Sequence, residues 1–174
     1  MAEQLAGLRQ PDQRSCGAAT LVAARMLLDP AYAATITRDN FDDEVLATHR
    51  RVTRPIDARG ALQLPWPRAL GTPPWAVARQ LAADDDGRSY AARLVLRRGR
   101  AFDRLAAHPA PSVLYVGSRW LPRHVVLVVE ASAASLRIYE PSRGRLVSVS
   151  RDDFLEGQLD LAGWRKPWFT VAPR

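Results

Sequence analysis

One run of seven residues, His124 to Glu130, limits most strongly the folds that this chain can adopt. Between its two ends the run reads Val-Val-Leu-Val-Val. β-branched residues favour strands, and a continuous apolar run lacks the alternation expected of a strand with one wet face. The run therefore predicts a central strand that is covered on both of its faces.

The two halves of the chain differ in their hydrophobic pattern. Residues 16–28 predict a buried helix, 40–50 an amphipathic helix, and 71–81 a helix entered through prolines. We expect strands over 90–96, 113–116, 124–130, 135–139, 145–149 and 168–171, and short helices over 102–108 and 152–159. Helices followed by an antiparallel sheet are typical of an α+β fold. We expect a single domain over 1–174, with a helical lobe over about 1–87 and a sheet lobe over about 88–174.

Cysteine content, hydropathy and charge argue against a disulfide-bonded, membrane-bound or nucleic-acid-binding protein. The only cysteine, Cys16, excludes an intrachain disulfide and fits a reducing compartment. Neither a long apolar run nor a signal-peptide pattern is present, so we expect a cytoplasmic chain with no membrane partner. The net charge of +7 comes mainly from arginines such as those at Arg97-Arg98-Gly-Arg100. No recognition motif accompanies them, so nucleic-acid binding is disfavoured.

Cys16 stands at the start of the first expected helix, with Ser15 as its N-cap. The unpaired N–H groups and the dipole at a helix N-terminus favour the thiolate, which is the nucleophilic form of cysteine. Gln10 precedes Cys16 beyond a turn-forming Pro11-Asp12 pair. Its amide, folded back beside the Cys16 backbone N–H, would form a two-donor oxyanion hole. The alternative is that Cys16 is only a small buried hydrophobic residue.

The pattern Gln10-x5-Cys16-Gly17, opening a helix, resembles the nucleophile motif of papain-like cysteine peptidases. It is most similar to the branch of double-glycine-leader (bacteriocin-processing) peptidases and their free-standing relatives. The resemblance implies a papain-like fold, in which the nucleophile helix packs on an antiparallel sheet that carries the catalytic histidine. It also implies hydrolysis of a peptide or protein substrate through a thioester acyl-enzyme, without a cofactor or metal. A bacterial peptidase, toxin or effector domain with a cognate inhibitor or immunity protein would fit this branch.

Three histidines are available as the base that the thiol needs. His49 lies among arginines at the end of an expected helix, and His108 lies in a loop that ends another. His124 begins the central strand. The resembled family places its histidine at the start of such a strand, and this resemblance selects His124.

The group that orients the histidine departs from the family pattern. The resembled branch carries Asp or Asn after the next strand, commonly before a proline, and here Glu140-Pro141 holds that position. Glutamate is one methylene longer, so its backbone must sit farther back. A salt bridge from Glu140 to Arg143 is the alternative. Gln13 is the rival to Gln10 for the oxyanion hole, although only Gln10 has the family spacing.

Substrate contacts are expected from a proline-rich loop over 51–74 and from residues beside the nucleophile. Trp66 in this loop and Trp75 after it would line a substrate groove, or they would only pin the loop to the core. Gly17 and Trp120 complete the expected substrate-binding residues.

Two other functions use the same residues. A Cys-dependent acyl or peptidyl transferase, transglutaminase or deamidase would share the nucleophile and the oxyanion hole. A catalytically idle peptide-binding module would keep only the groove.

Overall fold

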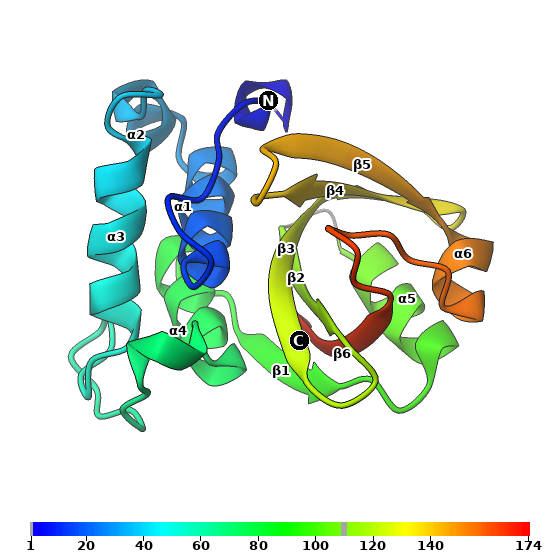
Figure 1. Ribbon diagram of the computed structural model, residues 1–174. Helices are drawn as coiled ribbons and strands as arrows, with labels where there is room; N and C mark the ends of the chain where they lie inside the picture. The colour runs from blue at the N-terminus through cyan, green and yellow to red at the C-terminus, as the bar shows by residue number, and fades with distance from the viewer. Residues whose placement is uncertain (1, 109–110) are drawn as a thin grey trace.

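The computed structural model describes residues 2–108 and 111–174, and its centre is a six-stranded antiparallel sheet (Figure 1). The strand order is β1-β6-β2-β3-β4-β5. The strands are β1 (Tyr90–Leu94), β2 (Ser112–Gly117), β3 (Pro122–Ala131), β4 (Ser135–Glu140), β5 (Arg145–Ser150) and β6 (Lys166–Pro173). A helical N-terminal part followed by this sheet confirms the predicted α+β class.

Helices cover the sheet on both sides. On one side lie α1 (Cys16–Leu28), α2 (Pro30–Thr35), α3 (Phe41–Val52) and α4 (Pro74–Asp84), and on the other α5 (Arg98–Ala106) and α6 (Arg151–Glu156) (Figure 1). Two short 3-10 turns, Ala2–Leu5 and Arg68–Leu70, complete the helical segments of the described chain. The arrangement gives the sheet two separate apolar cores.

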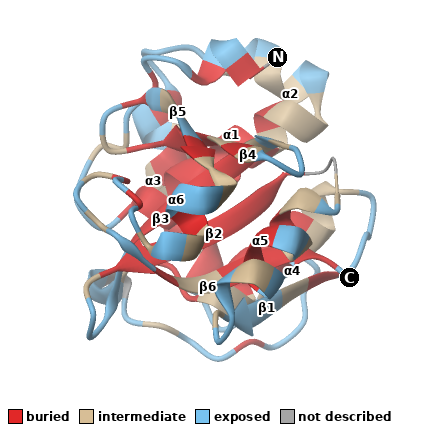
Figure 2. Ribbon diagram, turned by 90° about the vertical axis from the view of Figure 1, so that its right-hand side faces the viewer, coloured by how far each residue is buried: buried red, intermediate tan, exposed pale blue. Residues whose placement is uncertain are grey.

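The central run is buried on both faces, as predicted. Val125 and Leu127 of β3 join the core beneath α1, whereas Val126 and Val128 join the core beneath α5 and α6. Figure 2 shows the buried β2 and β3 behind α5 and α6. Successive side chains of a strand point to opposite faces, so both layers bury apolar side chains of this strand.

Helix α1 begins and ends at the predicted residues and is almost wholly buried. Its alanines let it pack closely against α3, α4 and β3. The Thr20 hydroxyl donates to the Val125 carbonyl at 3.3 Å, which ties α1 to β3 close to His124. Cys16 lies one helical turn before Thr20, so the same helix face carries the thiol toward β3.

Several element boundaries differ from the predictions. Helix α2 lies between the helices expected over 16–28 and 40–50 and was not predicted. Asp29 caps this helix by accepting from the Tyr32 N–H, and Pro30 occupies its first turn. Helix α4 runs over Pro74–Asp84 rather than 71–81, and α5 begins at Arg98, four residues earlier than predicted. Helix α6 stops before 159 because Gly157 adopts a left-handed φ of 75°.

The N-terminal segment is bound to the turn between β4 and β5. The Gly7 N–H donates to the Gly144 carbonyl at 2.7 Å, and the Gln10 N–H donates to the Pro141 carbonyl at 2.9 Å. Gly144 has a φ of +60°, and a side chain there would collide with the Leu8 carbonyl. These hydrogen bonds fix the segment that leads to Cys16 against the turn between β4 and β5.

Among the described residues, no helix combines the length and the apolar character needed to cross a bilayer.

Candidate active site

Cys16, His124 and Glu140 come together where the start of α1 meets the ends of two inner strands of the sheet. Cys16 is the first residue of α1, His124 lies near the start of β3, and Glu140 ends β4. Strands β3 and β4 are antiparallel with Leu127 opposite Tyr139, so His124 and Glu140 lie diagonally across the two strands. Diagonal neighbours are within reach of long side chains.

The His124 ring is held between the other two side chains. Its Nε2 atom lies 2.7 Å from Oε1 of Glu140. Cys16 lies close enough to the ring to raise the pKa of His124. Since Nε2 is engaged by Glu140, Nδ1 is the nitrogen left to face the thiol. Cys16 and His124 are each 5% exposed and Glu140 is 0% exposed, so this contact is shielded from water.

Glu140 receives two further hydrogen bonds from its own turn. The Ser142 N–H donates to Oε1 at 2.7 Å, and the Arg143 N–H donates to Oε2 at 3.2 Å. Arg143 thus contributes its backbone N–H, while the ion-pair partner of Glu140 is His124. The sequence prediction missed Ser142. Its signal was the turn-forming Pro-Ser-Arg-Gly that follows the acid, because a tight turn points N–H groups back at its first side chain.

Electrostatics favour a charged pair at this site. Burial alone would lower the pKa of His124, but its hydrogen bonds to Cys16 and Glu140, and the charges of both, raise that pKa to about 9. Burial opposes ionisation of Glu140, yet hydrogen bonds from His124 and Ser142 lower its pKa to about 2. Between these values imidazolium and carboxylate coexist.

The Ser15 hydroxyl does not cap α1. Ser15 occupies the N-cap position without a side-chain cap hydrogen bond, and its Oγ donates to the Asp12 carbonyl at 3.2 Å instead. Ser15 therefore supplies no side-chain acceptor to the N–H groups of the first turn of α1.

The side-chain amide of Gln10 is already engaged in a hydrogen bond within the loop before α1. Its Nε2 donates to the Asp12 carbonyl at 2.6 Å. Its Oε1 is buried and has no hydrogen-bond partner among the described residues. Gln13, the rival amide, is exposed.

Gly17 makes room for a neighbouring loop. A side chain at Gly17 would approach the Thr72 Cβ to 2.6 Å. The Tyr115 hydroxyl donates to the Thr72 carbonyl at 2.8 Å, and burial together with the nearby Cys16 raises the pKa of Tyr115. The sequence did not predict Thr72 and Tyr115 near the start of α1, because no local sequence pattern identifies residues that come there from distant segments.

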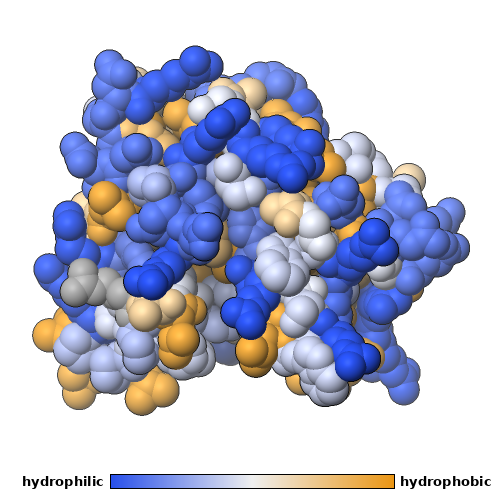
Figure 3. All heavy atoms as spheres, viewed as in Figure 1, coloured by the Kyte–Doolittle hydropathy of each residue, from blue (hydrophilic) through white to orange (hydrophobic). Residues whose placement is uncertain are grey.

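The three tryptophans expected at the substrate site differ in packing: Trp66 and Trp75 contact each other, whereas Trp120 is exposed. Trp66 and Trp75 pack edge to face with ring centroids 5.2 Å apart, which favours the interpretation that they pin the loop. Trp120 is 70% exposed, with the Arg119 guanidinium over its ring. Leucines 62, 64 and 70 of the proline-rich loop are also exposed. Figure 3 shows apolar side chains at the lower left, where Figure 1 draws the loop between α3 and α4.

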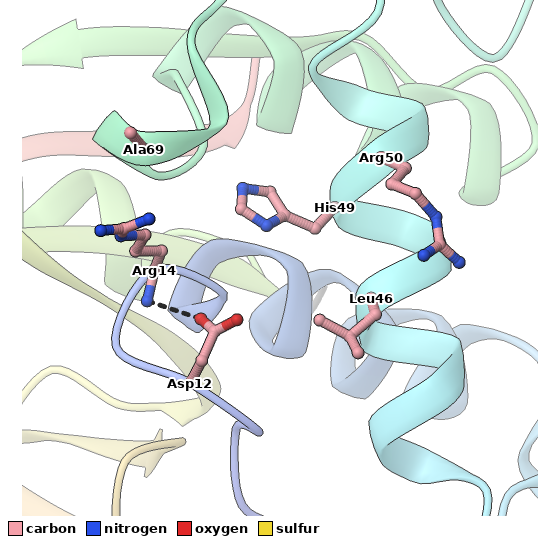
Figure 4. Close-up of a pocket in the computed structure, with 6 residues that line it drawn as sticks. All are labelled: Asp12, Arg14, Leu46, His49, Arg50 and Ala69. Carbon is pink, nitrogen blue, oxygen red and sulfur yellow. Dashed lines mark hydrogen bonds between the residues drawn. The ribbon is translucent and has the colours of Figure 1, made fainter.

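A pocket of about 240 Å³ is lined in part by Asp12 and Arg14 of the loop before Cys16. Its lining consists of Asp12, Arg14, Leu46, His49, Arg50 and Ala69 (Figure 4). The pocket holds the buried His49, not Cys16 or His124. His108 lies beyond the end of α5 and is absent from this lining as well. In the described part of the chain, no three His, Cys, Asp or Glu side chains are grouped as a metal site requires.

The likeness of this chain to known proteins lies in structure rather than in sequence. No protein-family model matches the sequence. No curated protein matches it. The chain is similar to a solved structure of the peptidase domain of Streptococcus ComA, a bi-functional ABC transporter involved in a quorum-sensing pathway. The TM-score is 0.49 and the identity 18%, over 96% of this chain and 97% of that chain. At this score the likeness by itself assigns no activity to the chain.

Proposed function

We propose that this chain is a cysteine peptidase, a single two-lobed domain that hydrolyses peptide bonds through a thioester at Cys16. One arrangement carries the proposal: the His124 ring lies 2.7 Å from Glu140 Oε1 and close enough to Cys16 for the thiol to raise its pKa. A thiol, an imidazole and a buried orienting carboxylate in series are the parts that acyl transfer needs.

The first step is acylation of the thiol. The imidazolium stabilises the Cys16 thiolate, whose sulfur attacks the substrate carbonyl carbon. A tetrahedral oxyanion forms, and His124 then gives its proton to the amine as the C–N bond breaks. The products are an S-acyl enzyme and a free amine.

Water completes the cycle. His124, now neutral, removes a proton from water as its oxygen attacks the thioester carbonyl. Collapse of the second tetrahedral species expels the thiolate and releases a carboxylic acid. Glu140 keeps the ring oriented and stabilises its charged form throughout.

The developing oxyanion has two candidate donors. The Cys16 backbone N–H belongs to the first turn of α1, where N–H groups have no partner within the helix, and Gln10 lies in the loop that leads to this turn. Substrate would approach past Gly17 and Trp120, with Trp66 and Trp75 supporting one wall. The partner that we propose is a peptide or protein, and this chemistry needs no cofactor.

The test uses an acyl donor that requires no knowledge of the natural substrate. With p-nitrophenyl acetate we expect a burst of p-nitrophenolate and an acetyl adduct on Cys16 by peptide mass spectrometry. The adduct should be released by hydroxylamine, as a thioester is. Cys16→Ala and His124→Ala should give no burst. A wild-type protein that stays unmodified would overturn the proposal.

A peptide library in H₂¹⁸O then distinguishes hydrolysis from transfer. Incorporation of ¹⁸O at new C-termini is the expected result. Products joined to an added amine would instead identify a transferase, and release of ammonia from glutamine a deamidase. Binding of peptides without any acylation would identify an idle module.

A further inference from the structure

The geometry points to Asp12 as a positioning residue, which holds the Gln10 amide and the backbone before Cys16 in place for oxyanion stabilisation. This inference rests on the proposed function. Asp12 lies between Gln10 and Cys16 in the sequence. Its carbonyl and its carboxylate hold different parts of the same loop.

The Asp12 carbonyl organises the side chains around it. It accepts from Gln10 Nε2 at 2.6 Å and from the Ser15 hydroxyl at 3.2 Å. The first bond sets the orientation of the amide, because a flipped amide would bring Oε1 against another carbonyl oxygen. One of the two amide hydrogens is used in this way, so the other remains available to an oxyanion.

The Asp12 carboxylate organises the backbone that follows. Its Oδ1 accepts from the Arg14 N–H at 2.7 Å, drawn in Figure 4, and from the Ser15 N–H at 2.9 Å. These bonds close a turn that ends one residue before the thiol. Burial would raise the pKa of Asp12, but these hydrogen bonds lower it, so the carboxylate stays charged.

Gln10 is consequently held at two points. Its backbone N–H is bonded to the Pro141 carbonyl, in the turn that carries Glu140. Its side chain is bonded to Asp12, in the loop that carries Cys16. A hydrogen-bond donor that is already oriented toward the oxyanion needs no reorganisation free energy when the oxyanion forms. Loss of the Asp12 turn should therefore impair the donor without removing the nucleophile.

Asp12 acts through Gln10 rather than on the substrate. Figure 4 shows its carboxylate at the pocket that also holds Arg14 and His49, and that pocket does not include Cys16 or His124. A positioning role predicts that substitution of Asp12 no longer changes the acylation rate once the Gln10 side chain has been removed.

The experiment compares two reagents on purified full-length variants. Acylation by p-nitrophenyl acetate passes through an oxyanion: the Cys16 sulfur bonds to the carbonyl carbon, and the C–O bond to p-nitrophenolate then breaks. Alkylation by iodoacetamide displaces iodide directly and forms no oxyanion. Asp12→Ala should slow acylation at saturating ester about tenfold or more, with alkylation nearly unchanged. Asp12→Asn keeps the Oδ1 acceptor and should restore most of the acylation rate.

A double-mutant cycle makes the test specific. Asp12→Ala in a Gln10→Ala background should slow acylation no further. Asp57→Ala is the matched control, because Asp57 closes a similar turn through the Arg59 and Ala61 N–H groups in the loop between α3 and α4. It should leave acylation unchanged at equal folded fraction by near-UV circular dichroism. If Asp12→Ala does not fold, Asp12→Ser, with a shorter oxygen acceptor, takes its place in both assays.

Each remaining result contradicts the inference. Normal acylation by Asp12→Ala, equal loss in both reagents, or losses that multiply with Gln10→Ala would each show that Asp12 does not act through the amide. An unreactive wild-type protein overturns the proposed function itself, and the role of Asp12 falls with it.

Discussion

Glu140 Oε1 lies 2.7 Å from Nε2 of His124, and the same oxygen accepts the Ser142 N–H at the same distance. The carboxylate is thus anchored to its own turn while it holds the ring. The longer arm of glutamate, which departs from the resembled pattern, is bent back over the turn by these bonds.

The length and the charge of Glu140 can be tested separately. Glu140→Gln keeps an acceptor but removes the charge, so the pKa of His124 should fall and acylation should slow moderately. Glu140→Ala should slow acylation more, by about 10²-fold, because the ring also becomes free to rotate. Glu140→Asp should lie between them, since a shorter arm cannot reach both His124 and Ser142. Ester acylation rates, with His124 followed by NMR, provide the measurement. Full activity in Glu140→Ala would mean that Cys16 and His124 act as a catalytic dyad without Glu140.

Gln10→Ala should lower the ester acylation rate by roughly 10²–10³-fold, as expected for loss of one oxyanion donor. The melting temperature should change little, because the amide makes a single hydrogen bond to Asp12. Gln13→Ala is the matched control, since Gln13 is exposed and lies in the same loop. If Gln13→Ala were the damaging change, the amide would be assigned to the wrong residue.

Stability should fall as the pH rises above neutrality. The pKa of His124 is raised to about 9 in the folded protein, so its contribution is complete below the ordinary histidine value of about 6.5 and is lost as pH rises through 9. Glu140 has the opposite sign, because its lowered pKa contributes above about 4.3 and is lost as pH falls through about 2. Urea unfolding between pH 6 and 9.5 should show a decline that is smaller in Glu140→Gln. Equal declines in both proteins would contradict the assignment to this pair.

Gly144→Ala should destabilise the protein by more than a positive φ alone explains. Its φ of +60° already disfavours a side chain, and the Leu8 carbonyl occupies the space that the side chain would need. Gly163→Ala is the control, because Gly163 has a φ of +84° with nothing within 4 Å. We expect about 1–2 kcal/mol for the control from left-handed strain, and a larger loss for Gly144→Ala, measured by urea unfolding. Equal losses would mean that the N-terminal segment shifts to accommodate the side chain.

Local patterns in the sequence determined the main elements. The alanine-rich run from Cys16 to Leu28 predicted a helix, and the β-branched run after His124 predicted a central strand. Helix propensity, β-branching and proline act over a few residues, so they can be read along the chain. The same local signals did not predict α2, because Asp29-Pro30 both follows one helix and begins another.

Only the tertiary structure decided how the chemical groups meet. The β3–β4 register sets His124 diagonal to Glu140, and the Thr20 bond to β3 brings the start of α1 to the same end of these two strands. Whether Glu140 could reach the ring depended on two backbone N–H groups, and the orientation of the Gln10 amide depended on the Asp12 carbonyl. The burial of apolar faces fixes that register and that packing, and burial is a property of the whole fold that no short stretch of residues contains.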